Sequence, residues 1–194
     1  MTSRIDDLLE EIATLERELE REFNQARKRW HYRIEAGRVR FGHEIRAAHL
    51  RLKQSVPRFL RESQPSTLIT APVVYSMIVP ITLLDIWVSA YQAICFRVYG
   101  IPRVKRSEYV VIDRHHLAYL NVIEKLNCVY CGYANGVFAY VREVAGRTEQ
   151  YWCPIRHARR VRAPHLHYRR FVDYGDADGY RRRLIPLRDE LKRD

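Results

Sequence analysis

The chain has 194 residues, of which 47% are hydrophobic and 29% charged, and this composition excludes a wholly disordered or collagen-like protein. Four cysteines are too few for a small disulfide-stapled fold, so we expect free thiols or metal ligands. The formal net charge of +11 favours an anionic partner, either phospholipid or nucleic acid, and charge alone does not distinguish the two.

Residues 1–62 are expected to form a long amphipathic helix. Ser3 and Asp6 have the spacing of a capping box, and apolar residues then recur at steps of three and four. The apolar positions are Ile5, Leu8, Ile12, Leu15 and Leu19. Because no proline occurs before Pro57, the helix is predicted to continue toward Ile45, with a bend at one of the two intervening glycines. Its regular heptads are few, so three roles stay open: a coiled coil that joins copies of the chain, packing on the protein's own domain, or contact with a membrane surface.

Residues 63–99 are expected to be a kinked, membrane-inserted helical segment. The run from Ser66 to Leu84 contains no charged residue and has about the 20-residue length that crosses a hydrocarbon core of ~30 Å. Pro72 and Pro80 each remove a backbone hydrogen-bond donor, so a straight helix is not predicted.

Two insertions fit this segment. In one, the chain spans the membrane once and Asp85 marks the far headgroup region. In the other, two half-helices enter and leave on the same side, which the basic residues on both flanks favour. Asp85 is expected to pair with an arginine, the alternative being a role in proton transfer, substrate binding or metal binding.

Residues 100–194 are expected to form a small, helical, basic domain around a metal site. Cys128, Cys131, Cys153 and His157 give the pattern C-x2-C-x21-C-x3-H, and three thiolates with one imidazole make a closed zinc site. We predict a structural zinc ion, with iron or an iron–sulfur cluster as the alternative. The neighbouring His115 and His116 are additional candidate ligands.

The letters CVYCGY at Cys128–Tyr133 resemble a rubredoxin or zinc-ribbon knuckle, in which a glycine after the second cysteine turns backbone amides toward the sulfurs. Cys153 and His157 stand where that family has a second C-x2-C pair. Residues 113–160 resemble uncharacterised bacterial membrane-associated proteins, a likeness that implies no mechanism. Because thiolates that hold a metal persist in a reducing compartment, we expect this domain on the cytoplasmic side of a bacterial inner membrane.

Other chemistry remains open for the same residues. Cys128 and Cys131 suit a dithiol redox pair, and His115 or His116 suits a general base, so a membrane-bound redox or metal-dependent enzyme is the alternative function. No nucleophile–base ordering and no phosphate-binding glycine loop occurs, so the sequence gives no specific ground for an enzyme and favours a non-enzymatic role.

The C-terminal tail interleaves arginines with aromatic residues. The arginines expected to contact an anionic surface are Arg159, Arg160, Arg162, Arg169 and Arg170. This composition suits either single-stranded RNA or anionic lipid, and the lack of a nucleic-acid motif favours lipid. The sequence thus predicts a membrane-associated, metal-binding adaptor or assembly factor.

Overall fold

The computed structural model describes residues 4–29, 32–35 and 38–193 of a mainly helical chain. The chain divides into two compact units. The first unit comprises residues 1–62 and 113–126, and the second comprises residues 63–112 and 127–194.

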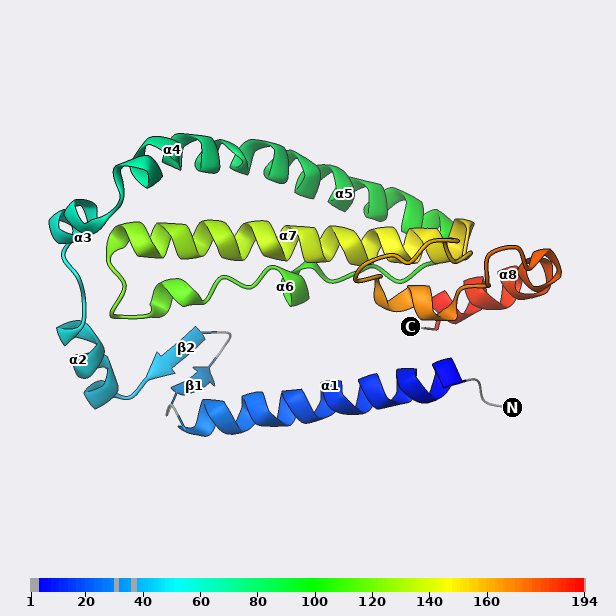
Figure 1. Ribbon diagram of the computed structural model, residues 1–194, viewed down its shortest axis with the longest axis horizontal. Coiled ribbons are helices and arrows are strands. Elements are labelled where there is room, and N and C mark those ends of the chain that lie inside the picture. The colour runs from blue at the N-terminus through cyan, green and yellow to red at the C-terminus, as the bar shows by residue number, and fades with distance from the viewer. Residues whose placement is uncertain (1–3, 30–31, 36–37, 194) are drawn as a thin grey trace. The chain divides into compact units, whose positions relative to one another are not determined.

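The first unit begins with an amphipathic helix, α1, over Arg4–Arg29 (Figure 1). At 1.5 Å per residue it is about 39 Å long. Five large apolar side chains on it are between 42% and 60% exposed, and we call them the apolar stripe of α1: Leu8, Ile12, Leu15, Leu19 and Phe23. Ser3, the predicted cap, lies outside the described residues. The helix predicted from the three-and-four periodicity is present.

The predicted continuation of this helix to Ile45 is wrong, because a β-hairpin follows it. Strands β1 (Tyr32–Glu35) and β2 (Arg38–Phe41) pair antiparallel, with Tyr32 opposite Phe41. Apolar and charged residues alternate along both strands in the sequence, a period of two that suits a strand better than a helix. Of the two glycines expected to bend a helix, Gly37 lies outside the described residues and Gly42 precedes the next helix.

Two short helices, α2 (His43–Arg51) and α3 (Val56–Glu62), complete the N-terminal part of this unit. The unit also includes a 3-10 turn at Arg114–His116 and the first residues of α7 (Val122–Trp152). A capping box begins α7. The Asn121 side chain accepts from the Glu124 backbone N–H at 3.0 Å, and the Glu124 carboxylate accepts from the Asn121 N–H at 2.7 Å.

In the second unit, the predicted membrane segment forms α4 (Pro65–Ser76) and α5 (Ile78–Tyr99). Together they make one helical stretch of 35 residues that is long and apolar enough to cross a membrane. Met77 separates the two helices, and Pro80 lies in the first turn of α5, where a missing N–H is tolerated. The expected pair of half-helices that returns to one side is not formed, because α4 and α5 follow one another in the same direction (Figure 1).

After α5, the chain reverses at Gly100, which has a left-handed φ of 71°. Residues 101–112, which we call the strap, run back along α5 and contain the short α6 (Arg106–Tyr109). The long α7 then runs parallel to α4 and α5 (Figure 1). The parallel register is fixed by side-chain contacts at both ends: Tyr75 with Asn127, and Tyr99 with Tyr151.

The strap lies close against α7 because Gly136 has no side chain. A Cβ atom at this position would lie 2.7 Å from the Tyr109 carbonyl oxygen and 2.7 Å from the Val110 Cα. Since real Cβ atoms do not approach backbone this closely, any larger residue at position 136 forces the strap away from the helix.

The C-terminal part of the chain adds a 3-10 turn at Leu166–Arg170 and the helix α8 at Ala177–Leu191. Asp176 caps α8 by accepting from the Gly179 N–H at 2.8 Å. The largest buried apolar cluster joins α5, the strap, α7 and α8 and consists of Phe96, Ile101, Val104, Tyr140, Val144 and Leu191. This cluster forms the main core of the second unit.

Candidate functional site

The four predicted metal ligands are separated by the length of α7. Cys128 and Cys131 lie near its start, whereas Cys153 directly follows its last residue. Because α7 is continuous, the stretch from Cys131 to Cys153 spans about 33 Å. His157 lies beyond Cys153, and its ring stacks on that of Tyr168 at 6.1 Å. The predicted Cys3His site is therefore not formed, and the part of the chain that the structure describes has no group of three or more His, Cys, Asp or Glu residues placed to hold a metal ion.

The knuckle-like sequence is helical because its glycine does not turn the chain. Gly132 is buried within α7 and continues the helix, whereas a zinc knuckle reverses direction after its second cysteine. All four cysteines are free, with Cys128 half-buried and Cys131 exposed. Burial and the nearby charge of Glu149 raise the pKa of the Cys153 thiol, which disfavours the reactive thiolate.

The two additional histidine candidates belong to the first unit. The rings of His115 and His116 lie side by side with centroids 3.9 Å apart. Nδ1 of His115 is buried and has no hydrogen-bond partner among the described residues. These rings pack on one another, and the described residues bring no further ligand to them.

Asp85 is buried and paired, as predicted. Arg106 donates from Nε and Nη2 to the two carboxylate oxygens at 2.7–3.1 Å, and the Tyr133 hydroxyl donates at 3.0 Å. The Arg106 guanidinium also lies 5.9 Å from the Tyr133 ring centre. Asp85 therefore fixes α6 between α5 and α7, and its carboxylate faces the protein rather than the outer side of α5.

A second polar residue of α5 holds the next turn of the strap. The Gln92 amide accepts from the Val104 N–H at 3.0 Å and donates to the Val104 carbonyl at 3.2 Å, so that it pairs with both backbone groups of one residue as a neighbouring strand would. The same amide donates to the Tyr140 hydroxyl of α7 at 2.5 Å. Asp85 and Gln92 are thus both satisfied inside the second unit.

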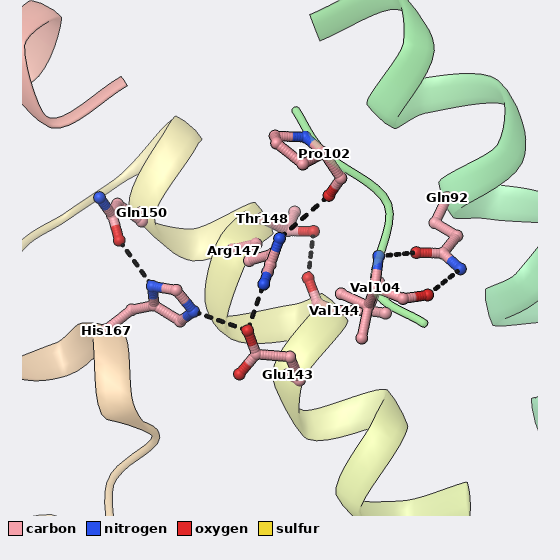
Figure 2. A network of polar contacts seen from close by, with 9 residues as sticks. All are labelled: Gln92, Pro102, Val104, Glu143, Val144, Arg147, Thr148, Gln150 and His167. Atoms are coloured by element: carbon pink, nitrogen blue, oxygen red, sulfur yellow. Dashed lines mark hydrogen bonds and ion pairs between the residues drawn. The ribbon is translucent and has the colours of Figure 1, made fainter. Parts of the chain in front are cut away.

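The densest polar network lies on the C-terminal half of α7 (Figure 2). Glu143 accepts from Arg147 Nε at 2.8 Å and pairs with His167 Nε2 at 2.9 Å. The other ring nitrogen of His167 lies 2.9 Å from the Gln150 amide oxygen, and the Gln150 amide nitrogen donates to the Leu187 carbonyl of α8 at 2.9 Å. Hydrogen bonds from His167 and Arg147 lower the pKa of Glu143 to about 2, against the opposing effect of burial.

A second carboxylate–imidazole pair lies on the same half of α7. His165 Nε2 and Glu149 are 2.9 Å apart, and the imidazole lies directly over Gly146, where a Cβ would come within 2.8 Å of Nδ1. Arg142 donates to the carbonyls of Ala163 and Pro164. Together the two histidines anchor residues 163–171 to α7. His167 is only 7% exposed, so its imidazole is part of the interior and not of the basic surface.

The side of α4 and α5 that faces away from these contacts is apolar. Eight of its large side chains are between 62% and 77% exposed, and we call them the outer face: Ile69, Val73, Val79, Leu83, Ile86, Trp87, Ile94 and Val98. At 100° per residue they fall within an arc of about 140°. The buried residues of α5 occupy the opposite side and are Ile81, Asp85, Gln92 and Phe96. Since monomeric soluble proteins rarely expose apolar patches of this extent, the outer face is the candidate functional surface.

The predicted anionic-surface arginines fall into two groups. Arg159, Arg160 and Arg162 are exposed on the loop that follows Cys153. Arg170 lies 3.8 Å from the Glu190 carboxylate, and the Arg169 carbonyl accepts from a neighbouring arginine at 2.6 Å. The loop therefore presents three exposed arginines, and the turn at Leu166–Arg170 adds Arg170, which is exposed but near Glu190.

Comparison with protein-family models, with curated proteins and with solved structures finds no match to this chain.

The Glu143 network was missed at the sequence level, although α7 carries a signal for it. Glu143, Arg147 and Gln150 recur at steps of four and three, so they share one face of the helix. A polar stripe of this kind within a helix that is otherwise rich in apolar residues indicates a buried polar partner. The identity of that partner, His167, depends on a tertiary contact that no spacing reveals.

Proposed function

We propose that this protein is a membrane-bound adaptor or assembly factor whose outer face enters one leaflet of a bilayer. The observation that carries the proposal is the division of α4 and α5 into two sides. The side away from the protein is apolar and exposed, and Asp85, the only charged residue between Glu62 and Arg97, points inward to Arg106.

The apolar area of the outer face is large enough for stable membrane binding. Full burial of a Val, Leu, Ile or similar side chain is worth roughly 1.5–3 kcal/mol, so immersing eight partly exposed ones is favourable by on the order of 10 kcal/mol. Trp87, which is 73% exposed, has the amphipathic ring that is typical of the membrane interface.

The packing of the strap favours a helix that lies in the plane of the membrane. The 35 residues of α4 and α5 extend about 52 Å, much more than the ~30 Å of the hydrocarbon core. A helix that crossed the bilayer with Asp85 near its middle would carry Arg106 to the same depth. The neighbouring Lys105 and Glu108, whose side chains are 78% and 60% exposed, would then enter hydrocarbon. At roughly 2.5–3.5 kcal/mol for each charged side chain at the centre, that placement is unfavourable, and an in-plane helix avoids it.

Two further surfaces suit an adaptor. The exposed arginines of the loop after Cys153 would add roughly 1 kcal/mol each near an anionic leaflet, which is the expected charge at the cytoplasmic side of a bacterial inner membrane. The apolar stripe of α1 suits a partner helix, and we assign it to association with α1 of a second copy.

Depth measurements with spin labels test the proposal. Variants without the native cysteines carry a single cysteine in place of Ile69, Val79 or Ile94, and Lys105→Cys is the matched aqueous control. After reconstitution into phosphatidylglycerol and phosphatidylcholine vesicles, the accessibility of each nitroxide to oxygen and to a nickel complex reports its depth. We expect similar depths within one leaflet at the three outer-face positions and full exposure to water at position 105. A depth gradient from position 69 to position 94 would establish a spanning helix instead, and three labels in water would overturn the proposal.

A further inference from the structure

An apolar groove lies in the second unit between α5 and the C-terminal half of α7. Its volume is about 420 Å³, and its lining includes Val88 from α5 and Val141, Ala145, Trp152 and Cys153 from α7 and its end. Pockets that hold small ligands commonly measure roughly 300–1,000 Å³. Val141 and Cys153 are twelve residues apart, so the lining on the α7 side extends about 18 Å.

The polar groups that line this groove are already used by the protein. The Thr148 hydroxyl donates to the Val144 carbonyl at 2.8 Å and lies 3.0 Å from the Tyr91 hydroxyl. The Glu149 carboxylate is paired with His165 at 2.9 Å. A polar metabolite would therefore lose its hydrogen bonds to water and gain few in return. A flexible hydrocarbon chain needs no such partners.

The position of the groove indicates where a hydrocarbon chain would come from. Val88 and Tyr91 belong to the same turns of α5 as Trp87 and Ile94 of the outer face, so one wall of the groove belongs to the helix that we place in the lipid. At the other end, Cys153 begins the loop that exposes three arginines, a charge that suits a lipid phosphate.

We propose that this groove holds one acyl chain of a membrane phospholipid, with the headgroup toward the arginines that follow Cys153. The proposal rests on the proposed membrane function, because a bilayer supplies the ligand. In this proposal the protein has two contacts with lipid. The outer face lies in the bilayer, and one phospholipid fills the groove between α5 and α7.

Native mass spectrometry of the full chain tests the groove. The protein is reconstituted with dioleoyl phosphatidylglycerol, extracted into detergent and analysed for retained phospholipid. Ala145→Trp places an indole in the groove, and Ala139→Trp places the same side chain at an exposed position of the same helix. We expect one bound phospholipid on the wild type and on Ala139→Trp. In Ala145→Trp we expect phospholipid occupancy to be at least about tenfold lower, which corresponds to a tenfold larger dissociation constant. Equal occupancy in both variants, detergent alone in the wild type, or a dimer that Ala145→Trp dissociates would overturn the proposal.

Two further measurements separate the possible failures. Flotation with vesicles reports on membrane binding through the outer face. If the wild type does not float, the proposed function is contradicted. If the wild type and Ala145→Trp both float but neither retains phospholipid, only the proposal for the groove is contradicted. Alkylation of Cys153 in a chain that lacks the other cysteines does not depend on the folding of the tryptophan variant. Adding the phospholipid to protein in detergent is expected to slow this reaction severalfold, and an unchanged rate would contradict occupancy of the groove.

Discussion

Replacing Glu143 with glutamine tests the buried network that anchors residues 163–171 to α7. The Glu143 side chain is 11% exposed and interacts with both Arg147 and His167. These hydrogen bonds lower its pKa from the ordinary 4.5 to about 2. At 1.36 kcal/mol for each factor of ten in proton affinity, the ionised carboxylate contributes about 3 kcal/mol to the stability of the folded protein.

The pH dependence of this contribution has a definite sign. Because folding lowers the pKa of Glu143, the unfolded chain takes up the proton first as the pH falls. The stabilisation is therefore complete above about pH 4.5 and is lost progressively toward pH 2. Glutamine at position 143 does not titrate, so the difference in unfolding free energy between wild type and Glu143→Gln is expected to shrink by about 3 kcal/mol over this range.

Urea unfolding in a mild detergent, followed by far-ultraviolet circular dichroism at pH values from 7 to 2.5, measures this difference. Glu108→Gln is the matched control, because Glu108 is 60% exposed and lies 3.5 Å from Lys105. The control is expected to change stability by less than about 0.5 kcal/mol at every pH, as is usual for an exposed ion pair. A Glu143→Gln effect that equals the control, or one that does not vary between pH 7 and pH 2.5, would refute the assignment of the network as a stabilising contact.

Three other outcomes follow from the packing. Gly136→Ala is expected to destabilise the protein by about 1–3 kcal/mol in the same unfolding assay, because the added methyl group pushes the strap away from α7. Alanine is the better helix former, so a stabilised variant would contradict the close approach of the strap to α7. A short bifunctional thiol reagent is expected to leave Cys131 and Cys153 of one chain unlinked, and a crosslinked peptide pair within the monomer would contradict the continuity of α7. Leu15→Glu combined with Leu19→Glu is expected to reduce the oligomer seen by analytical ultracentrifugation, and unchanged sedimentation would exclude the apolar stripe of α1 as the contact between copies.

The features that the sequence predicts well are those set by local pattern. The apolar stripe of α1 follows from three-and-four periodicity, and the membrane segment follows from a long run without charge. The predicted Cys3His metal site is not formed, and the reason is physical. A C-x2-C-x21-C-x3-H pattern holds one ion only if the chain reverses between Cys131 and Cys153, and spacing in sequence carries no information about reversal. The intervening residues form one helix, so the same spacing separates the two ends by about 33 Å.

The sequence does not predict the hairpin, because an alternation of apolar and charged residues over only four positions per strand is also compatible with the periodicity of a longer helix. Ile34, four residues after Trp30, also fits an apolar helical face when the helix is assumed to continue from Arg29. Pairing with the next strand resolves the ambiguity, since each residue then gains a partner across the ladder.

Two buried polar residues within the apolar segment, Asp85 and Gln92, indicate how that segment meets lipid. Asp85 and Gln92 are seven residues apart, so they lie on one side of α5, two turns from each other. A helix surrounded by lipid on all sides has no use for such residues, because each would lack a partner or require one from another helix. Here the partners are Arg106 and the backbone N–H and carbonyl of Val104, both on a strap that carries exposed charge. A helix with one apolar side and one side bonded to a charged segment is suited to the interface between lipid and water. The polar contacts of α5 therefore favour an in-plane position more strongly than its length does.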